Sequence, residues 1–151
     1  MGVMRVLALL VLLPLAIVIG CAAPAPETVV FPDENLDAAI RGALDKPAGE
    51  AMTPAELAGL TELTATRKDI TDLSGIEYCT NLVVLILDGN QRSDISTLAS
   101  LSNLKYLSFG SNQISDISSL ASLSKLVSLK FRINQVRDIS PLASLTKLEF
   151  L

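Results

Sequence analysis

The stretch NQISDISSLASLSKL, from Asn112 to Leu126, returns almost unchanged as NQVRDISPLASLTKL, from Asn134 to Leu148. The two copies begin 22 residues apart. The first copy combines more serines than an ordinary core with leucines spaced too regularly for a loop. Self-similarity at a fixed period of this size predicts stacked structural repeats.

The 22-residue period extends over several columns of the sequence. These columns are Leu82, Leu104, Leu126 and Leu148; Asn90, Asn112 and Asn134; Asp94, Asp116 and Asp138; Ile95, Ile117 and Ile139; Leu98, Leu120 and Leu142; Leu101, Leu123 and Leu145. A more diverged copy starts at Leu60, and Cys79 occupies one of its leucine positions. The chain stops at Leu151, three residues into a further copy, which favours a truncated reading frame.

Each copy has two halves with different hydrophobic periods. LKYLSF, from Leu104 to Phe109, alternates as a β-strand does, whereas DISSLASL, from Asp116 to Leu123, spaces its apolar residues by three, as a tight helical turn does. Ser140 and Pro141 fit the start of such a turn, as a cap and a first helical residue. One strand and one turn cannot bury their own apolar side, so the copies must stack with their strands parallel in one curved sheet.

The segment before the repeats predicts a helical cap. FPDENLDAAIRGALDKP, from Phe31 to Pro47, reads as a helix that Asp33 caps and that ends at Lys46–Pro47. Its apolar face contains Leu36, Ala39, Ile40, Ala43 and Leu44. TPAE, from Thr53 to Glu56, is a capping box with proline at the first helical position. We therefore divide this part of the chain into a cap, residues 31–59, and repeats, residues 60–151.

These residues resemble a known family. Leu104 to Leu123 follows the pattern LxxLxLxxNxIxDIxxLxxL of the 22-residue leucine-rich repeat, and its DIS-L-SL half most resembles the internalin type. The resemblance covers Phe31 to Leu151. It implies an α/β repeat solenoid with a parallel concave sheet, short 3-10 or helical turns on the convex side and an N-terminal helical cap. Members of the family often act as adhesins or recognition proteins.

The N-terminus predicts export. Arg5 precedes an apolar run from Val6 to Ile19, so residues 1–20 read as a secretory signal peptide. Val18 to Cys21, VIGC, resembles the lipobox of bacterial lipoproteins, which implies that Cys21 is lipidated and becomes the first mature residue. The alternative is a membrane-spanning helix near the lower length limit with an incidental cysteine. Residues 21–30 then form the lipidated cysteine and a Pro/Ala tether, in a protein held outside the cytoplasm at the cell membrane or envelope.

Composition argues against several classes of function. The net charge is −4 without a basic cluster, so a nucleic-acid partner is not expected. The absence of histidine removes the commonest general base and metal ligand. We predict no enzyme activity, no cofactor and no metal. Calcium at the stacked aspartates Asp72, Asp94, Asp116 and Asp138 is the alternative to their capping the helical turns.

Other columns invite structural explanations. Asn90, Asn112 and Asn134 form a ladder whose side chains, by the family resemblance, bond backbone groups across the turn after each strand. Lys68 interrupts that ladder, so the first turn should be less regular. Cys79 should be buried and unreactive. Arg92 replaces an apolar residue and should avoid burial, either by extending to solvent or by loosening the turn.

The concave sheet face is the candidate recognition surface, because alternate strand residues point away from the core. The predicted partner-binding residues are Val84, Ile86, Asp88, Tyr106, Ser108, Lys130, Arg132 and Phe150. Exposed apolar residues around an aromatic centre with charged edges suit protein recognition, although strand propensity alone also favours valine, isoleucine, tyrosine and phenylalanine.

These features favour a lipid-anchored, extracytoplasmic leucine-rich repeat protein that mediates protein–protein recognition or adhesion. One alternative is a spacer that presents a missing C-terminal domain, because a stacked array needs a polar terminal cap and this sequence has none. Another alternative is an envelope structural protein without a specific ligand.

Overall fold

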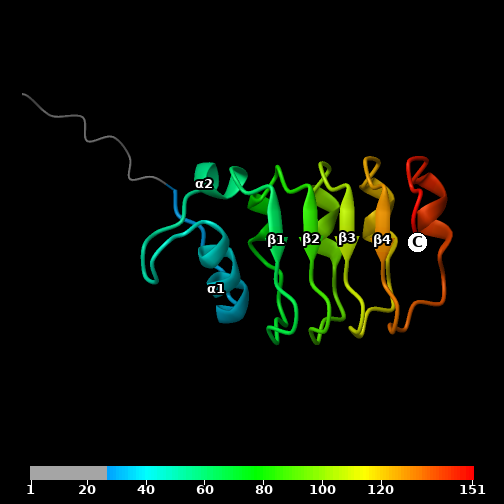
Figure 1. The fold of residues 1–151 in the computed structure, drawn as a ribbon, viewed down its shortest axis with the longest axis horizontal. Coiled ribbons are helices and arrows are strands. Elements are labelled where there is room, and N and C mark those ends of the chain that lie inside the picture. The colour runs from blue at the N-terminus through cyan, green and yellow to red at the C-terminus, as the bar shows by residue number, and fades with distance from the viewer. Residues whose placement is uncertain (1–26) are drawn as a thin grey trace, which may run out of the picture.

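The computed structural model describes residues 27–151, and the chain winds along one long axis from two helices to the C-terminus (Figure 1). The predicted signal peptide, the lipidation site at Cys21 and the first part of the tether lie outside the described residues. Val29 already belongs to the fold, because an isolated antiparallel bridge joins it to Met52.

The first helix, α1 (Glu34–Ala43), begins as predicted at Asp33, whose Oδ1 accepts the amides of Asn35 and Leu36. Leu36 and Ile40 are fully buried. Ala43 was expected on the same face but is exposed. It is the last residue of α1, and the next residue, Leu44, makes the contact with the core instead.

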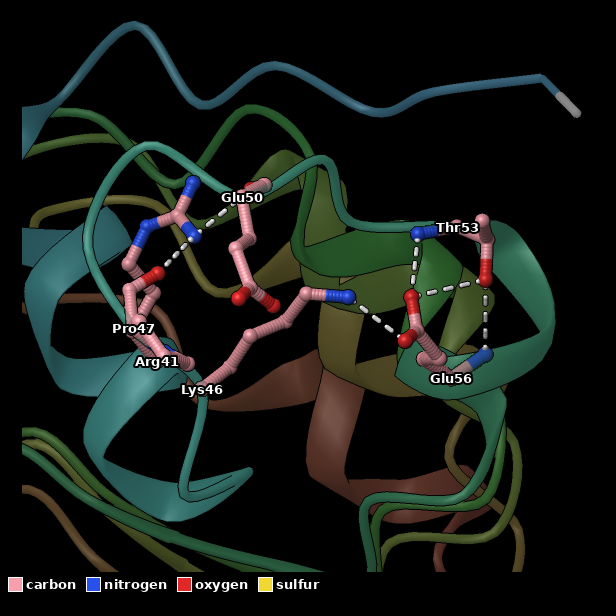
Figure 2. Close-up of polar contacts among 6 residues, drawn as sticks. All are labelled: Arg41, Lys46, Pro47, Glu50, Thr53 and Glu56. Carbon is pink, nitrogen blue, oxygen red and sulfur yellow. Dashed lines mark hydrogen bonds and ion pairs between the residues drawn. The ribbon is translucent and has the colours of Figure 1, made fainter.

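The second helix, α2 (Pro54–Ala58), has the predicted capping box, in which Thr53 and Glu56 bond each other's backbone amides (Figure 2). Glu56 also accepts a hydrogen bond of 2.5 Å from Lys46 Nζ. The loop between the helices is held by Arg41, whose Nη1 donates to two loop carbonyls (Figure 2). The hydrogen bond from Lys46, followed by those from Thr53, lowers the pKa of Glu56 to about 2.

Four short strands form one parallel sheet in the order β1-β2-β3-β4 (Figure 1). Their bounds are Glu62–Thr64, Val84–Ile86, Tyr106–Ser108 and Ser128–Lys130. Leu63, Leu85, Leu107 and Leu129 are partners in successive pairs. Phe150 continues the series with an isolated parallel bridge to Ser128. This register follows the 22-residue period and confirms the leucine-rich repeat solenoid.

A 3-10 helix lies behind the sheet in each repeat (Figure 1). The four are η1 (Ile76–Tyr78), η2 (Ser96–Ser100), η3 (Ser118–Ser122) and η4 (Ser140–Ser144). Ser140 was expected to cap its turn, but it is the first residue of η4, and Asp138 Oδ1 accepts its amide at 2.8 Å. An aspartate reaches the amide two residues later in this way, so the oxygen comes from the preceding loop. Asp94 and Asp116 bond their turns in the same manner.

The core lies between the sheet and the 3-10 helices. Leu85, Leu107 and Leu129 are at most 2% exposed. Phe109 and Phe131 pack with ring centroids 6.1 Å apart and planes tilted by 37°. In the final repeat Ile139 is 57% exposed, whereas Ile117 is 1% exposed, because no further copy covers η4 within the described chain. No helix among residues 27–151 combines the length and the apolar character that crossing a bilayer requires.

Candidate recognition surface

The outer sheet face, the side of the sheet opposite the leucine core, carries the residues predicted to bind a partner. Pairing aligns them across the repeats. One row contains Glu62, Val84, Tyr106, Ser128 and Phe150, and the next contains Thr64, Ile86, Ser108 and Lys130. Each strand is buried only at its central residue, so these rows point away from the core.

The apolar residues of this face differ in exposure. Tyr106 is 48% exposed and Phe150 is 62% exposed. Val84 and Ile86 are only half-buried. We call these four residues the apolar band. Its aromatic side chains are accessible to a partner, while its aliphatic side chains are partly covered.

A hollow of about 830 Å³ lies beside the apolar band, where the chain leaves the strands. Its lining residues are Thr66, Arg67, Asp88, Gly89, Ser108, Gly110, Ser111, Lys130, Phe131, Arg132 and Leu151. Asp88 and Ser108, both predicted as contact residues, are hydrogen-bonded to each other at 2.7 Å, and Gly110 N–H donates to the same Asp88 Oδ1 at 2.6 Å. Asp88 therefore links two neighbouring repeats within the lining of the hollow.

Three cations surround the hollow, and Arg67 among them was not predicted from the sequence. Lys130 and Arg132 were predicted, and all three are exposed. The Cγ atom of Arg67 lies 2.8 Å from the position that a Cβ would take on Gly89. The absence of a side chain at Gly89 therefore makes room for the methylene groups of Arg67.

Arg67 belongs to a column with left-handed backbone. The φ angles are 52° at Arg67, 70° at Gly89, 55° at Ser111 and 56° at Ile133. Only one member is glycine, so residue type alone did not reveal the column. Its sequence signal is the position itself, directly before the asparagine ladder or its lysine replacement.

The asparagine ladder lies inside the turns. Asn90 Oδ1 accepts the amides of Lys68 and Ile70, and its Nδ2 donates to the carbonyls of Ala65 and Leu87. The bonds to residues 65, 68 and 70 reach into the preceding repeat. Without Asn90 the amides of Lys68 and Ile70 and the carbonyl of Ala65 would lack a partner in the turn, whereas the carbonyl of Leu87 also accepts Nδ2 of Asn112.

Asn112 and Asn134 bond their own and the preceding repeat in the same way. Asn90 and Asn112 are 3% and 8% exposed, which leaves little of either side chain accessible to a ligand. The first turn, where Lys68 replaces asparagine, has an additional left-handed residue at Asp69, with φ of 55°. This is the irregularity expected from Lys68.

A second polar ladder at the other end of the strands was not predicted. Asn81 Nδ2 donates to the carbonyl of Ala58 at 2.8 Å, and Asn103 Nδ2 donates to that of Thr80 at 2.9 Å. Lys125 continues the series by donating to Asn103 Oδ1. The 22-residue separation of Asn81 and Asn103 was the available signal.

Comparison with known proteins agrees with this geometry. The family model described as Leucine Rich repeats (2 copies) matches residues 102–144. Internalin H of Listeria monocytogenes is 50% identical over 69 residues, which are 45% of this chain and 13% of that protein. The crystal structure of an internalin, InlF, from Listeria monocytogenes is 41% identical with a TM-score of 0.79 and covers 84% of this chain.

The repeats of this chain are internalin-like leucine-rich repeats. A solved structure of the CBM51-2 and INT domains of Clostridium perfringens ZmpB is also similar, at 28% identity and a TM-score of 0.54, over 62% of this chain and 20% of that one. The chain spans only 38% of the InlF chain and 13% of Internalin H.

Within these internalin-like repeats, Arg92 contradicts its prediction. It occupies the column of Ile70 and Ile114, yet it is only 4% exposed. Its Nη2 donates to the carbonyl of Asp94, while Nε and Nη1 are buried without a hydrogen-bond partner. Desolvation lowers the pKa of Arg92, against the opposing effect of nearby carboxylates including Asp72. Ile70 and Ile114, its counterparts in the adjacent repeats, are fully buried as well, so the whole column lies inside the solenoid.

Cys79 is fully buried in a leucine column of the internalin-like repeats. Burial, with a smaller contribution from the charge of Glu77, raises the pKa of its thiol to about 12. A thiolate is therefore strongly disfavoured at neutral pH. Among residues 27–151, no three His, Cys, Asp or Glu side chains gather as a metal site would require.

Proposed function

We propose that this protein is a non-enzymatic recognition module that binds a protein partner, or mediates adhesion, through the outer sheet face. The observation that carries this proposal is the apolar band, with Tyr106 48% and Phe150 62% exposed on a paired sheet. Exposed aromatic residues with a polar surround are typical of protein-binding hot spots. The likeness to internalins supports the same class of function.

The scaffold suits recognition because it holds this face rigidly. Successive strands are paired, and the buried asparagine ladder connects each turn to the one before it. Side chains supported in this way lose little conformational entropy when a partner binds. The arrangement thus favours a preformed binding surface.

The proposal includes export and a lipid anchor at Cys21. Its support is the apolar run that ends in VIGC, Val18 to Cys21. A diacyl anchor would hold the protein firmly, since two acyl chains are needed for stable membrane attachment. Mass spectrometry of the protein from its native membrane tests this, and an unmodified thiol at Cys21 would contradict it.

A site-specific photo-crosslinker tests the recognition surface. Benzoylphenylalanine at position 106 should form a covalent adduct with one protein when the variant is irradiated in the presence of partner cells. The same group at position 78 should not, because Tyr78 is also exposed but lies in η1, behind the sheet. Both positions hold a tyrosine in the natural chain, so the two variants are closely matched.

Substitutions then test the same surface without a label. Tyr106→Ala and Ile86→Asp should each weaken capture of the cross-linked partner by about tenfold or more, equivalent to about 1.4 kcal/mol. Tyr78→Ala should retain it. Capture at full strength by both sheet-face variants, with circular dichroism unchanged, would rule out this surface.

A further inference from the structure

We infer that the partner presents an acidic peptide segment to the hollow, where Arg67, Lys130 and Arg132 receive its carboxylates. This inference rests on the proposed recognition function and adds the chemistry of the partner. We call these three residues the cationic rim. They lie beside the apolar band on the same face, so one partner can contact both.

The charge distribution is the first argument. The whole chain carries a net charge of −4, yet the side chains that line the hollow include three cations and one carboxylate, Asp88. Asp88 Oδ1 already accepts hydrogen bonds from Ser108 and Gly110. The ion pairs found among residues 27–151 are Arg41–Asp37 and Lys46–Glu56, so no carboxylate oxygen of this part of the chain lies within ion-pair distance of the cationic rim.

The direction of the arginine stems is the second argument. Arg67 passes over Gly89 in the following repeat, with Cγ 2.8 Å from the position of a Cβ there. Arg132 lies against Gly110 in the preceding repeat, with Cγ 3.4 Å from the corresponding position. The two side chains therefore lean toward each other over the middle repeats, from opposite sides. Any side chain at Gly89 would obstruct this course.

The spacing indicates the form of the ligand. Neighbouring strands lie about 4.8 Å apart, so the backbones of the repeats that carry Arg67 and Arg132 are about 14 Å apart. An extended peptide spans that distance with about four residues. Guanidinium groups bind carboxylates through two parallel hydrogen bonds. A segment with two or more Asp or Glu residues within about four positions matches this arrangement, and apolar neighbours can reach Tyr106.

Binding of a labelled hexaglutamate peptide to the full-length protein in neutral detergent tests the inference. Fluorescence anisotropy should show saturable binding that weakens when salt rises from about 50 mM to about 500 mM, because surface charges are screened. A hexaglutamine peptide should not bind. Exchange of Arg67, Lys130 and Arg132 for glutamine should weaken hexaglutamate binding by about tenfold or more.

The matched control is a triple variant that removes the same charge elsewhere. Lys125, Arg137 and Lys147 are exposed cations outside the hollow, and their exchange for glutamine should change affinity by less than about twofold. Equal loss in both triple variants, or no hexaglutamate binding up to about 1 mM, would overturn the inference. Binding of phosphatidylglycerol vesicles through the cationic rim, without hexaglutamate binding, would also overturn it.

Failure of this inference is distinguishable from failure of the proposed function. If capture of the cross-linked partner depends on Tyr106 but is unaffected by loss of the cationic rim, the acidic-segment inference is wrong and recognition stands. If hexaglutamate binds as described but no partner is captured at position 106, the anion-binding chemistry stands and the proposed recognition surface is wrong.

Discussion

The carboxylate of Asp33 joins the N-terminal helix to Thr71, which lies 38 residues later in the first repeat. Its Oδ1 caps α1, while its Oδ2 accepts the amide of Thr71 at 2.7 Å, the hydroxyl of Thr71 at 3.0 Å and the amide of Asp72 at 3.0 Å. One buried side chain thus satisfies donors from two parts of the fold. The helical cap is coupled to the repeats through it.

Asp33→Asn should lower the free energy of unfolding by about 2–3 kcal/mol, because the new amide group would face the donors of Thr71 and Asp72. Urea denaturation measures the change. Asp37→Asn is the matched control on the same helix. It removes a surface pair with Arg41 and should cost less than about 1 kcal/mol. Equal effects of the two substitutions would contradict the role of Asp33.

The effect of Asp33→Asn should depend on pH. Burial alone would raise the pKa of Asp33, but the hydrogen bonds from Thr71, Leu36 and Asp72 outweigh it, and the net pKa is lowered. The unfolded state therefore binds the proton more tightly. The ionised Asp33 side chain therefore stabilises the fold fully at pH values above the ordinary carboxyl pKa. This stabilisation is lost as the pH falls through the pKa that Asp33 has in the folded state. The difference in the free energy of unfolding between the wild-type protein and Asp33→Asn should become smaller as the pH is lowered. A difference that grows on acidification would contradict this prediction.

Asn112→Ala should be much more destabilising than Asn103→Ala. Removal of Asn112 leaves the buried amide of Arg92 without a partner and takes one of two side-chain donors from each of the carbonyls of Leu87 and Phe109, which keep Asn90 and Asn134, at a total cost of about 2–4 kcal/mol. Asn103 makes its bonds at the surface, so its loss should cost less than about 1 kcal/mol. Thermal melts of the two variants provide the comparison, and similar losses would show that the inner ladder is not special.

Replacing the buried Arg92 should stabilise the protein. Arg92→Ile removes two unpaired buried nitrogens and restores the residue type found at positions 70 and 114. Replacement of a buried charge by a packed apolar side chain raises stability by about 1–4 kcal/mol in favourable cases. Arg137→Ile, at an exposed site, should change it by less than about 0.5 kcal/mol. A lower melting temperature for Arg92→Ile would show that the charge has a stabilising partner.

Ile133 holds a strained backbone without the compensation of burial. It is 72% exposed with φ of 56°, a region that β-branched residues avoid. Ile133→Asn should raise the free energy of unfolding by about 1 kcal/mol, because asparagine tolerates this conformation. Ile133→Val keeps the branched side chain and serves as the control, with no gain expected. A gain of the same size in both variants would point to a cause other than backbone strain.

Cys79 should be inert in the folded protein. In a Cys21→Ser background it is the remaining thiol, and its pKa of about 12 together with complete burial excludes the thiolate. Ellman's reagent at about pH 8 should therefore react slowly with the native chain and rapidly after denaturation. Fast labelling under native conditions would show that this repeat opens readily.

Much of the fold was predictable because the sequence repeats. The equivalent residues of successive copies all indicate the environment of the same structural position. The leucine columns predicted the pairing of Leu85 with Leu107, and TPAE predicted the capping box at Thr53. Tyr106 and Phe150 were placed on the outer sheet face by strand alternation alone. These features depend on near neighbours in sequence or on the period itself.

Other features depend on residues from two repeats at once. Burial of Arg92 was not predictable from its charge, since its column, with Ile70 and Ile114 in the adjacent repeats, lies inside the packed solenoid. The side chain of Arg67 lines the hollow because Gly89, in the next repeat, has no Cβ that would obstruct its methylene groups. Asp88 and Ser108 were predicted to contact a partner, and the hydrogen bond between them, which joins two neighbouring repeats, was not predicted.

The sequence by itself determined the 22-residue register, and with it the parallel sheet and the side on which each residue lies, because a strand and a turn that repeat can bury their leucines only by stacking. The tertiary structure alone decided which of those outward residues are accessible, which bond one another and where the unpaired cations gather. The reason is that accessibility and pairing are set by distances between side chains of different repeats, and those distances exist only once the copies are packed.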